Sequence, residues 1–250
     1  MSGRIGLIVG SGFEQLGLAI VARSPLKTPY GEPSSSVLTV ACAGEELLCL
    51  ARHGVPHAIA PHEINYRANM WALKQHGVTC CVALNAVGAI APGFGPADLA
   101  VPDQLIDYTH GRADTFGGPD GAVVHVAFTE PFEPLLRGHL AAAVHDCGLG
   151  ARGGTYGVTQ GPRLETAAEI DRLARDGCAM VGMTAMPEAV LARELDIAYA
   201  ICALAVNYAA GRAPGHGDIH AEIAHSLATG MQRQRTVLER LVPRLARAAL

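Results

Sequence analysis

Two short stretches place groups that can bind an anion directly after apolar runs. In LARHG, Arg52 and His53 follow one apolar run, and in IVGSGFEQLG another leads into Gly10, Ser11 and Gly12. A guanidinium makes forked contacts with phosphate oxygens, a His can add a donor, and a glycine-rich turn lets backbone N–H groups approach an anion. Because open α/β sheets bind ligands at the carboxyl ends of their strands, both stretches predict an anion site. The alternatives are a solvated strand end and a simple tight turn.

Further polar residues follow later apolar runs. In MVGMTAMPEAVLARE, Met183 and Thr184 lie between a run that ends at Gly182 and a helix expected to begin near Pro187. A Thr hydroxyl there can bind an anion, and a Met can pack on a flat or apolar ligand or simply fill the core. In LAVNYAAG, Asn207 ends a ten-residue apolar run, and its amide must find partners in a turn or in a ligand.

The stretch TQGPRLETAAEI places the carboxylate of Glu165 after a Gly-Pro turn, at the expected beginning of a helix. An acid in the first turn of a helix complements the helix dipole, which requires no ligand. The other interpretation is that this carboxylate binds a ligand.

Other catalytic patterns are incomplete in this chain. A dinucleotide fingerprint would need a third glycine where Gln15 stands, and no acidic residue ends a second strand at the expected distance. The pair His62-Glu63 is similar to the beginning of a zinc-protease helix, but Tyr66 stands where the second His would be. Ser11 lacks the spacing of a nucleophile elbow, and the 11 histidines show no other metal-ligand spacing. These patterns argue against a dinucleotide, a bound metal and a serine nucleophile.

Composition limits the partners and the compartment. Half of the 250 residues are hydrophobic, which fits a single domain over residues 1–250. The chain has 19 Lys and Arg and 23 Asp and Glu, which gives a net charge of -4. Because the basic residues are scattered singly and form no basic stripe, we expect no nucleic-acid partner. Seven cysteines without a Cys-x-x-Cys pair are typical of reduced thiols in the cytoplasm. No apolar run is long enough to cross a bilayer, and we expect neither export nor membrane insertion.

An α/β fold must position these residues. Short runs rich in Val, Ile, Leu and Ala alternate with helix-like stretches, as in strands that are buried on both faces and connected by helices. The predicted strands are residues 5–9, 46–51, 79–84, 154–158, 179–182 and 197–206. The predicted helices are residues 66–75, 133–146, 165–176, 187–194 and 219–248, the last with one apolar face. Segments 111–121 and 211–217 are predicted loops at a site.

Taken together, these stretches resemble the family of trimeric purine nucleoside phosphorylases and methylthioadenosine phosphorylases over nearly the whole chain. The segments that carry the resemblance, in matching order, are IVGSGFEQLG, ARHG, NYRANMWALKQHG, NAVGAI, VPDQLIDYT, TQGPRLETAAE, GMTAMPEAVLARE and LAVNYAAG. The resemblance implies a Rossmann-like α/β phosphorylase fold with a mixed central sheet flanked by helices, and a homotrimer. It also implies purine salvage without a metal or organic cofactor, in which phosphate attacks the sugar C1′ and a free purine base is released.

The resemblance also implies roles for single residues. The phosphate-binding positions are matched by Ser11, Arg52, His53, Ala86 and Thr184, with Ala86 acting through its backbone N–H. Met183 matches a position that packs on the ribose, and His125 matches a residue that a neighbouring subunit contributes. Glu165 and Asn207 match the positions that contact the base, where Asn207 would donate to O6 or N7 as the base leaves.

Glu165 and Asn207 together imply which base is released. The branches of this family that act on purine nucleosides and on thioinosine have Glu and Asn at these positions, whereas the adenine-using branch has Ser and Asp. The N1–H of a 6-oxopurine can donate to a carboxylate, but the lone pair of adenine N1 would face it. We therefore expect hypoxanthine as the leaving base, and NAVG, DQLIDYT and QGPRLET are similar to the S-methyl-5′-thioinosine branch.

The sugar end distinguishes the remaining substrates. A methylthio group needs an apolar pocket, which Ile219 and Ile223 could line, whereas a 5′-hydroxyl needs a hydrogen-bond partner. His220 lies near the position where inosine-cleaving members of the family have a His. An inosine and guanosine phosphorylase and a methylthioadenosine phosphorylase therefore stay as alternatives. A hydrolytic nucleosidase and a purine-binding module are also considered, but neither would need Arg52 and His53.

Overall fold

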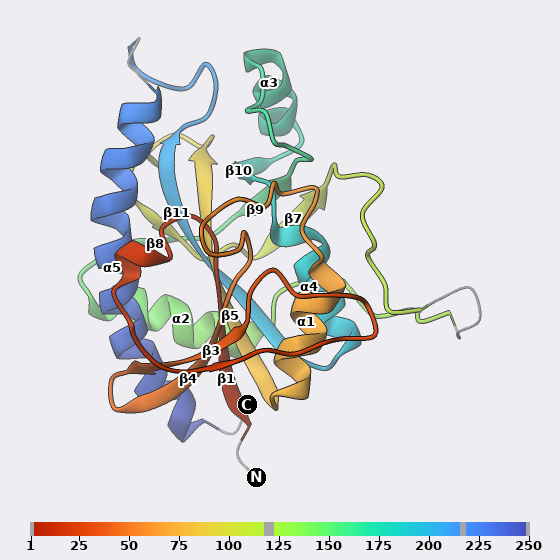
Figure 1. Cartoon of the computed structure of the whole chain (residues 1–250). Helices are drawn as coiled ribbons and strands as arrows, with labels where there is room; N and C mark the ends of the chain where they lie inside the picture. Colours follow the sequence, from red (N-terminus) through yellow and green to blue (C-terminus); the bar gives the residue numbers. More distant parts are fainter. Residues whose placement is uncertain (1–2, 118–122, 216–218, 249–250) are drawn as a thin grey trace.

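A mixed β-sheet forms the centre of the computed structural model, which describes residues 3–117, 123–215 and 219–248 (Figure 1). Its strands are β1 (Arg4–Val9), β2 (Ala19–Ser24), β3 (Val37–Cys42), β4 (Glu45–Ala51), β5 (Val78–Ala89), β6 (Leu99–Ala100), β7 (Gln104–Asp107), β8 (Ala151–Arg152), β9 (Thr155–Val158), β10 (Cys178–Gly182) and β11 (Ala198–Tyr208). Its helices are α1 (Tyr66–Gln75), α2 (Pro134–Asp146), α3 (Ala167–Arg175), α4 (Ala185–Glu194) and α5 (Ile219–Arg247), with a short 3-10 helix, η1 (Glu14–Leu16).

Within the described residues, eleven strands join in one sheet. Hydrogen-bonded neighbours follow the order β2-β3-β4-β1-β5-β10-β9-β7, and β11 pairs with both β5 and β6. The pairs that β1 makes with β4 and β5 are parallel, as is the β5–β11 pair, whereas β3 is antiparallel to both β2 and β4 and β10 is antiparallel to β5. The predicted fold class, a mixed sheet flanked by helices, is therefore confirmed.

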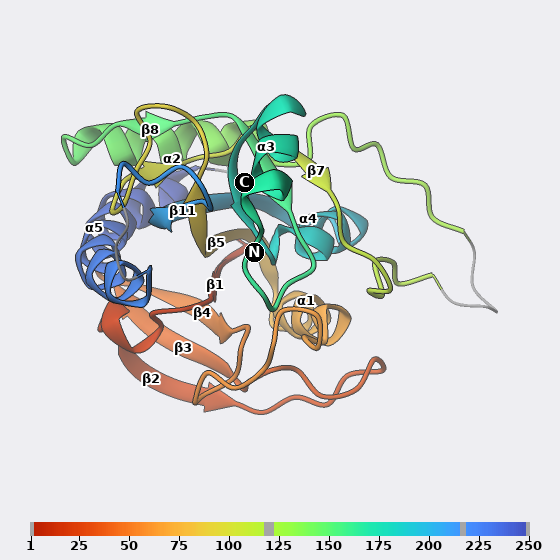
Figure 2. The ribbon, with the colours of Figure 1, turned by 90° about the horizontal axis from the view of Figure 1, so that it is seen from above.

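The long strand β5 separates two hydrophobic layers because its side chains alternate between the two faces of the sheet. Cys81 and Ala83 belong to the cluster that includes apolar residues of α1 and α4. Cys80 and Val82 belong to the cluster that includes residues of α2 and α5. Figure 2 shows these two pairs of helices on opposite sides of β5 and β11. Both faces of the central strands are thus buried, which explains their nearly continuous apolar sequences.

Parallel pairing brings three predicted site segments to one edge of the sheet. Val9, at the end of β1, pairs with Ala51 at the end of β4 and with Leu84 in β5. The residues that follow these three positions therefore leave the sheet side by side. This register brings Ser11, the Arg52-His53 pair and the second half of β5 together.

One predicted helix beginning, that of α3, is wrong, and α4 has an irregular first turn. Helix α3 begins at Ala167 rather than at Glu165, because Thr166 and Glu169 form a capping box that ends the preceding loop. Glu165 therefore lies outside the helix. Helix α4 is assigned from Ala185, but Met186 has a non-helical backbone, so the continuous helical part begins at Pro187, as predicted.

The remaining differences concern strands that were not predicted and strands that extend further than predicted. The sequence predicted none of β2, β3, β6, β7 and β8, two of which have only two residues each. The edge strand β2 is largely exposed, so its burial pattern carries little signal. Strands β5 and β11 continue beyond their predicted ends, to Ala89 and Tyr208. The predicted bounds of α1 are those observed.

Between β7 and α2 the chain leaves the body of the molecule as an extended segment without regular structure in its described residues (Figures 1 and 2). Parts of the predicted loops 111–121 and 211–217, namely residues 118–121 and 216–217, lie outside the described residues. No helix in the described ranges is long and apolar enough to cross a membrane.

Candidate active site

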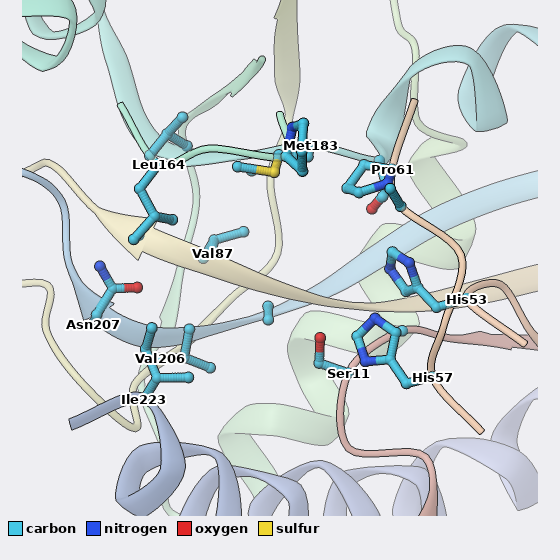
Figure 3. A pocket seen from close by; sticks show the side chains of 18 of the residues that line it. Ser11, His53, His57, Pro61, Val87, Leu164, Met183, Val206, Asn207 and Ile223 are labelled. Carbon is cyan, nitrogen blue, oxygen red and sulfur yellow. The ribbon is translucent and has the colours of Figure 1, made fainter. Parts of the chain in front are cut away.

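A cavity of about 440 Å³ lies where the carboxyl ends of β1 and β4 meet β5. Eight of the residues predicted from the sequence line it: Ser11, Arg52, His53, Ala86, Glu165, Met183, Thr184 and Asn207. Figure 3 shows Ser11 and His53 at one end of the cavity, Asn207 at the other, and Met183 between them. The volume is in the range of small-molecule sites.

Arg52 is the central group at the first end, although only 1 % of it is exposed. One terminal nitrogen donates to Thr184 Oγ1 at 2.6 Å, and the other donates to Asn85 Oδ1 at 3.1 Å. Its Nε lies 3.0 Å from Glu188 Oε1, and Tyr199 donates its hydroxyl hydrogen to Glu188 Oε2 at 2.8 Å. These contacts fix the guanidinium in one orientation.

The Arg52–Glu188 pair brings two opposite charges into the protein interior. Burial raises the pKa of the Glu188 carboxyl, and the Arg52 charge opposes that shift. Burial lowers the pKa of Arg52, but the charge of Glu188 and the hydroxyls of Tyr199, Tyr66 and Tyr156 together outweigh burial, so the pKa is raised and the guanidinium stays charged. Buried charges are tolerated when they are paired and hydrogen-bonded, as they are here. An anion in the cavity would therefore meet hydrogen-bond donors of fixed orientation around Arg52, whose charge is balanced by Glu188.

Two hydrogen bonds within the protein fix the hydroxyl of Thr184, which lines the cavity. Its Oγ1 accepts from Arg52 and also from Asn85 Nδ2 at 3.1 Å. Because a hydroxyl oxygen has two lone pairs, both are now occupied and only the hydroxyl hydrogen is left. Asn85 was not predicted as a site residue, although a polar amide inside the apolar run of β5 is a visible signal.

The ring of His53 offers an acceptor. Its Nδ1 lies 2.8 Å from the carbonyl oxygen of Ile59, which can only accept, so Nδ1 carries the hydrogen. Burial lowers the pKa of His53 to about 4, which keeps the ring neutral and leaves Nε2 with a lone pair. This differs from the donor expected for His53, and it suits the hydroxyl of a hydrogen phosphate. The unpredicted His57 also lines the cavity, its ring centroid 4.3 Å from that of His53.

Glu165 lies in the loop between β9 and α3. The hydroxyl of Thr159 donates to its Oε1 at 2.6 Å. In the same loop Gly161 has a φ of 63°, and a Cβ there would come within 2.4 Å of Met183 Sδ. Glycine is therefore required where this loop approaches Met183.

Asn207 is directed into the cavity by an irregularity in β11. The pairing of β11 with β5 shifts register between Ala205 and Asn207, which leaves Val206 as an extra residue. Such bulges re-aim side chains near active sites. The amide nitrogen of Asn207 donates to Tyr208 O at 2.6 Å, so its second N–H is left for a ligand. Asn207 is thus part of a strand, not of the turn considered from the sequence.

Arg112 connects the loops that carry these residues. One of its terminal nitrogens donates to the carbonyl oxygens of Met183 and Met186, at 2.8 and 2.6 Å, and the other to that of Gln160 at 2.9 Å. Its guanidinium also lies over the ring of Tyr66, at 5.4 Å from the centroid. Nothing in the sequence distinguished this residue, because its partners are backbone carbonyls of distant segments.

The remaining predicted residues lie in α5 and in the extended segment between β7 and α2. In the described part of α5, Ile223 and Leu227 line the cavity, and Val206 lies near Ile223 (Figure 3). His220 falls within the first turn of α5, but its side chain lies outside the described residues. His125 is exposed on the extended segment and does not line the cavity of its own chain. Over the described residues, no group of three or more His, Cys, Asp or Glu could hold a metal ion.

An anion site and a carboxylate–amide pair at opposite ends of one cavity, on this fold, are what a nucleoside phosphorylase requires, since it must hold phosphate beside the sugar while it contacts the base. The chain belongs to the phosphorylase superfamily, whose family model matches residues 4–243.

Relatives with described activities are similar to the chain over most of its length. The probable S-methyl-5′-thioinosine phosphorylase of Pseudomonas syringae pv. tomato is 49 % identical over 240 residues, 94 % of this chain and 97 % of that protein. The 6-oxopurine nucleoside phosphorylase of Pyrococcus furiosus is 44 % identical over 88 % of this chain and 84 % of that protein. Among solved structures, methylthioadenosine phosphorylase from Schistosoma mansoni in complex with adenine matches with a TM-score of 0.92 at 29 % identity, covering 98 % of this chain and 93 % of that chain.

Proposed function

We propose that this enzyme catalyses the phosphorolysis of a 6-oxopurine nucleoside, with S-methyl-5′-thioinosine as its preferred substrate. The products would be hypoxanthine and 5-methylthioribose 1-phosphate, and phosphate would be a co-substrate without any metal or organic cofactor. The observation that carries the proposal is that the Arg52 network and the Glu165–Asn207 pair line one cavity.

The proposed reaction uses the anion end to hold the nucleophile. Phosphate would bind to Ser11, Thr184, the backbone N–H of Ala86, and Arg52 with His53. As the bond between C1′ and the base breaks, positive charge develops on the sugar and negative charge on the purine. A phosphate oxygen then bonds to C1′, and the free N–H of Asn207 would stabilise the departing base at O6 or N7. No covalent bond to the enzyme forms.

Base selectivity would come from Glu165. With Oε1 occupied by Thr159, Oε2 is left to accept from the N1–H of a 6-oxopurine. Adenine presents a lone pair at N1, which the carboxylate would repel. A site that matches the hydrogen-bonding edge of one base discriminates against a base with a mismatched edge by a factor on the order of 10⁴ in kcat/KM.

Preference at the 5′ position would come from α5. Ile223 and Leu227 give the cavity an apolar wall there, which suits a methylthio group better than a hydroxyl. The thioinosine name of the Pseudomonas relative supports the same substrate. An inosine and guanosine phosphorylase is the second candidate, because the Pyrococcus relative is named a 6-oxopurine nucleoside phosphorylase, and inosine and guanosine are 6-oxopurine nucleosides.

The chain is further proposed to act as a homotrimer in the cytoplasm, with His125 reaching the cavity of a neighbouring subunit. Support comes from the extended segment that carries His125, which projects from the body of the molecule (Figure 1). Val123 and Val124, next to His125, are 79 % and 48 % exposed.

The proposal is tested by measuring base release from S-methyl-5′-thioinosine, inosine and S-methyl-5′-thioadenosine, each with and without phosphate. We expect release that depends on phosphate and is fastest for S-methyl-5′-thioinosine. Equal rates without phosphate would indicate a hydrolase instead. A preference for inosine would select the second candidate, and a preference for the adenine nucleoside would contradict the role of Glu165.

A further inference from the structure

Thr159 occupies the first position after β9, beside the loop that carries Glu165. Its backbone N–H donates to the carbonyl oxygen of Gly182 at 2.8 Å, which ties it to the end of β10. Its side-chain hydroxyl is 2.6 Å from Glu165 Oε1. A residue anchored between two strands thus contacts a carboxylate that lies before the N-cap of α3.

The direction of this hydrogen bond follows from the groups involved. An ionised carboxylate only accepts, so the Thr159 hydroxyl is the donor. The other acceptor near this hydroxyl, the Gly182 carbonyl oxygen, is 3.4 Å away and therefore a much weaker partner. A hydrogen bond to a charged group is among the stronger kinds in proteins.

Glu165 stands in the wall between two hollows. It lines the active-site cavity and also a second hollow of about 270 Å³, which Thr159 lines as well. The second hollow carries the exposed cationic side chains of Arg163 and Arg172. Both cations already pair with carboxylates, Arg163 with Glu169 and Arg172 with Asp176, but the hollow gives a Glu165 carboxylate released from Thr159 room to turn away from the base.

We propose that Thr159 is a positioning residue for base specificity: it holds the Glu165 carboxylate in the wall so that Oε2 accepts from a 6-oxopurine N1–H. This inference rests on the proposed function. Thr159 does not line the active-site cavity, so it acts through Glu165 and not on the substrate.

The decisive variant is Thr159→Val, which removes the hydroxyl and keeps the shape of the side chain. The kcat/KM for S-methyl-5′-thioinosine falls about tenfold, the size expected for one hydrogen bond to a charged group. The kcat/KM for S-methyl-5′-thioadenosine does not fall, and the KM for phosphate is unchanged. The ratio of the two kcat/KM values therefore drops by about the same factor.

Three further variants isolate the hydroxyl. Thr159→Ser keeps the donor and preserves the ratio. In a Glu165→Ala background, which has no side-chain acceptor for the hydroxyl, Thr159→Val causes little further change, because the two residues act as one unit. Thr155→Val makes the same substitution at another half-buried threonine, at the beginning of β9, and leaves the ratio unchanged. Thermal melting of each variant shows whether the fold is retained.

The inference is overturned if Thr159→Val leaves the ratio of the two kcat/KM values unchanged, whether or not both values fall. Calorimetric binding of hypoxanthine and adenine gives a second readout, in which Thr159→Val weakens only hypoxanthine. If the unmodified enzyme shows no phosphate-dependent release from any nucleoside, the proposed function fails. Calorimetric binding of hypoxanthine and adenine then still tests the role of Thr159. Equal changes in the affinities for the two bases overturn the inference.

Discussion

At the scale of single residues, the anion end of the cavity is organised around one buried cation. Arg52 meets Thr184, Asn85 and Glu188 within the protein, so its orientation is set before any ligand arrives. Donors that are already oriented need not reorganise when charge develops during a reaction. A lysine at position 52 would keep the charge but not the planar fork that reaches several partners at once.

The pKa of His53 predicts how stability depends on pH. Burial lowers this pKa to about 4, from an ordinary value of 6.5 that applies in the unfolded chain. Above pH 6.5 the ring is neutral in both states. As the pH falls from 6.5 to 4 the unfolded chain takes up a proton and the folded chain does not, so the free energy of unfolding decreases by about 3 kcal/mol.

We expect His53→Asn to lack this decrease. Urea unfolding at several values between pH 4 and 7, in buffers without phosphate, measures it directly. His145→Asn, at an exposed position on α2, serves as the matched control and keeps the decrease. Identical pH dependences for the parent protein and His53→Asn would contradict the prediction.

At the scale of secondary-structure elements, the site depends on loops that follow β7, β9 and β10. Arg112 follows β7, and it binds carbonyl oxygens of Gln160 after β9 and of Met183 after β10. These loops carry Glu165 and Thr184, the groups proposed for the base and for phosphate. One side chain therefore couples the two ends of the cavity.

Replacing Arg112 by Met should loosen both ends together. We expect the KM values for nucleoside and for phosphate to rise, and the melting temperature to fall by about 5 °C, because several partly buried hydrogen bonds are lost. Steady-state kinetics and thermal melting give these values. Arg175→Met, at an exposed position on α3, is the control and should change neither. A rise in only one of the two KM values would show that Arg112 does not couple the ends.

At the scale of the whole molecule, the extended segment between β7 and α2 is the feature that the single chain does not explain. It presents the exposed apolar pair Val123 and Val124 beside His125. Contiguous exposed apolar side chains are typical of contact surfaces. The proposed homotrimer would cover this segment and complete the cavity of a neighbour.

Subunit mixing tests this arrangement. We expect a mass near three times 26.0 kDa by light scattering, and low activity for both Arg52→Ala and His125→Ala. Trimers reassembled from the two variants together should recover part of the activity. The reason is that some cavities would then combine an intact Arg52 with an intact His125 from a neighbour. No recovery in trimers shown to be mixed would contradict a role for His125 across the interface.

Much of the fold follows from local patterns. The apolar runs of β1, β4 and β10 and the periodicity of α1 and α5 come from residues close together in the sequence, and their bounds are nearly those predicted. The two-residue strands β6 and β8 have no such pattern, because only their pairing with distant strands makes them strands. The predicted beginning of α3 at Glu165 was wrong because the capping box of Thr166 and Glu169 starts the helix two residues later, at Ala167.

The amino-acid sequence alone was enough to identify the polar residues at or just beyond the ends of buried strands: Ser11, Arg52, His53, Thr184 and Asn207. It could do so because strand burial is a local property, and a polar residue after an apolar run is visible without any neighbour. What these residues contact depends on the tertiary structure. Arg52 and Thr184 are 132 positions apart in the chain, and their contact depends on the register of the whole sheet. The Thr159–Glu165 bond depends likewise on how a loop between two elements folds back on itself.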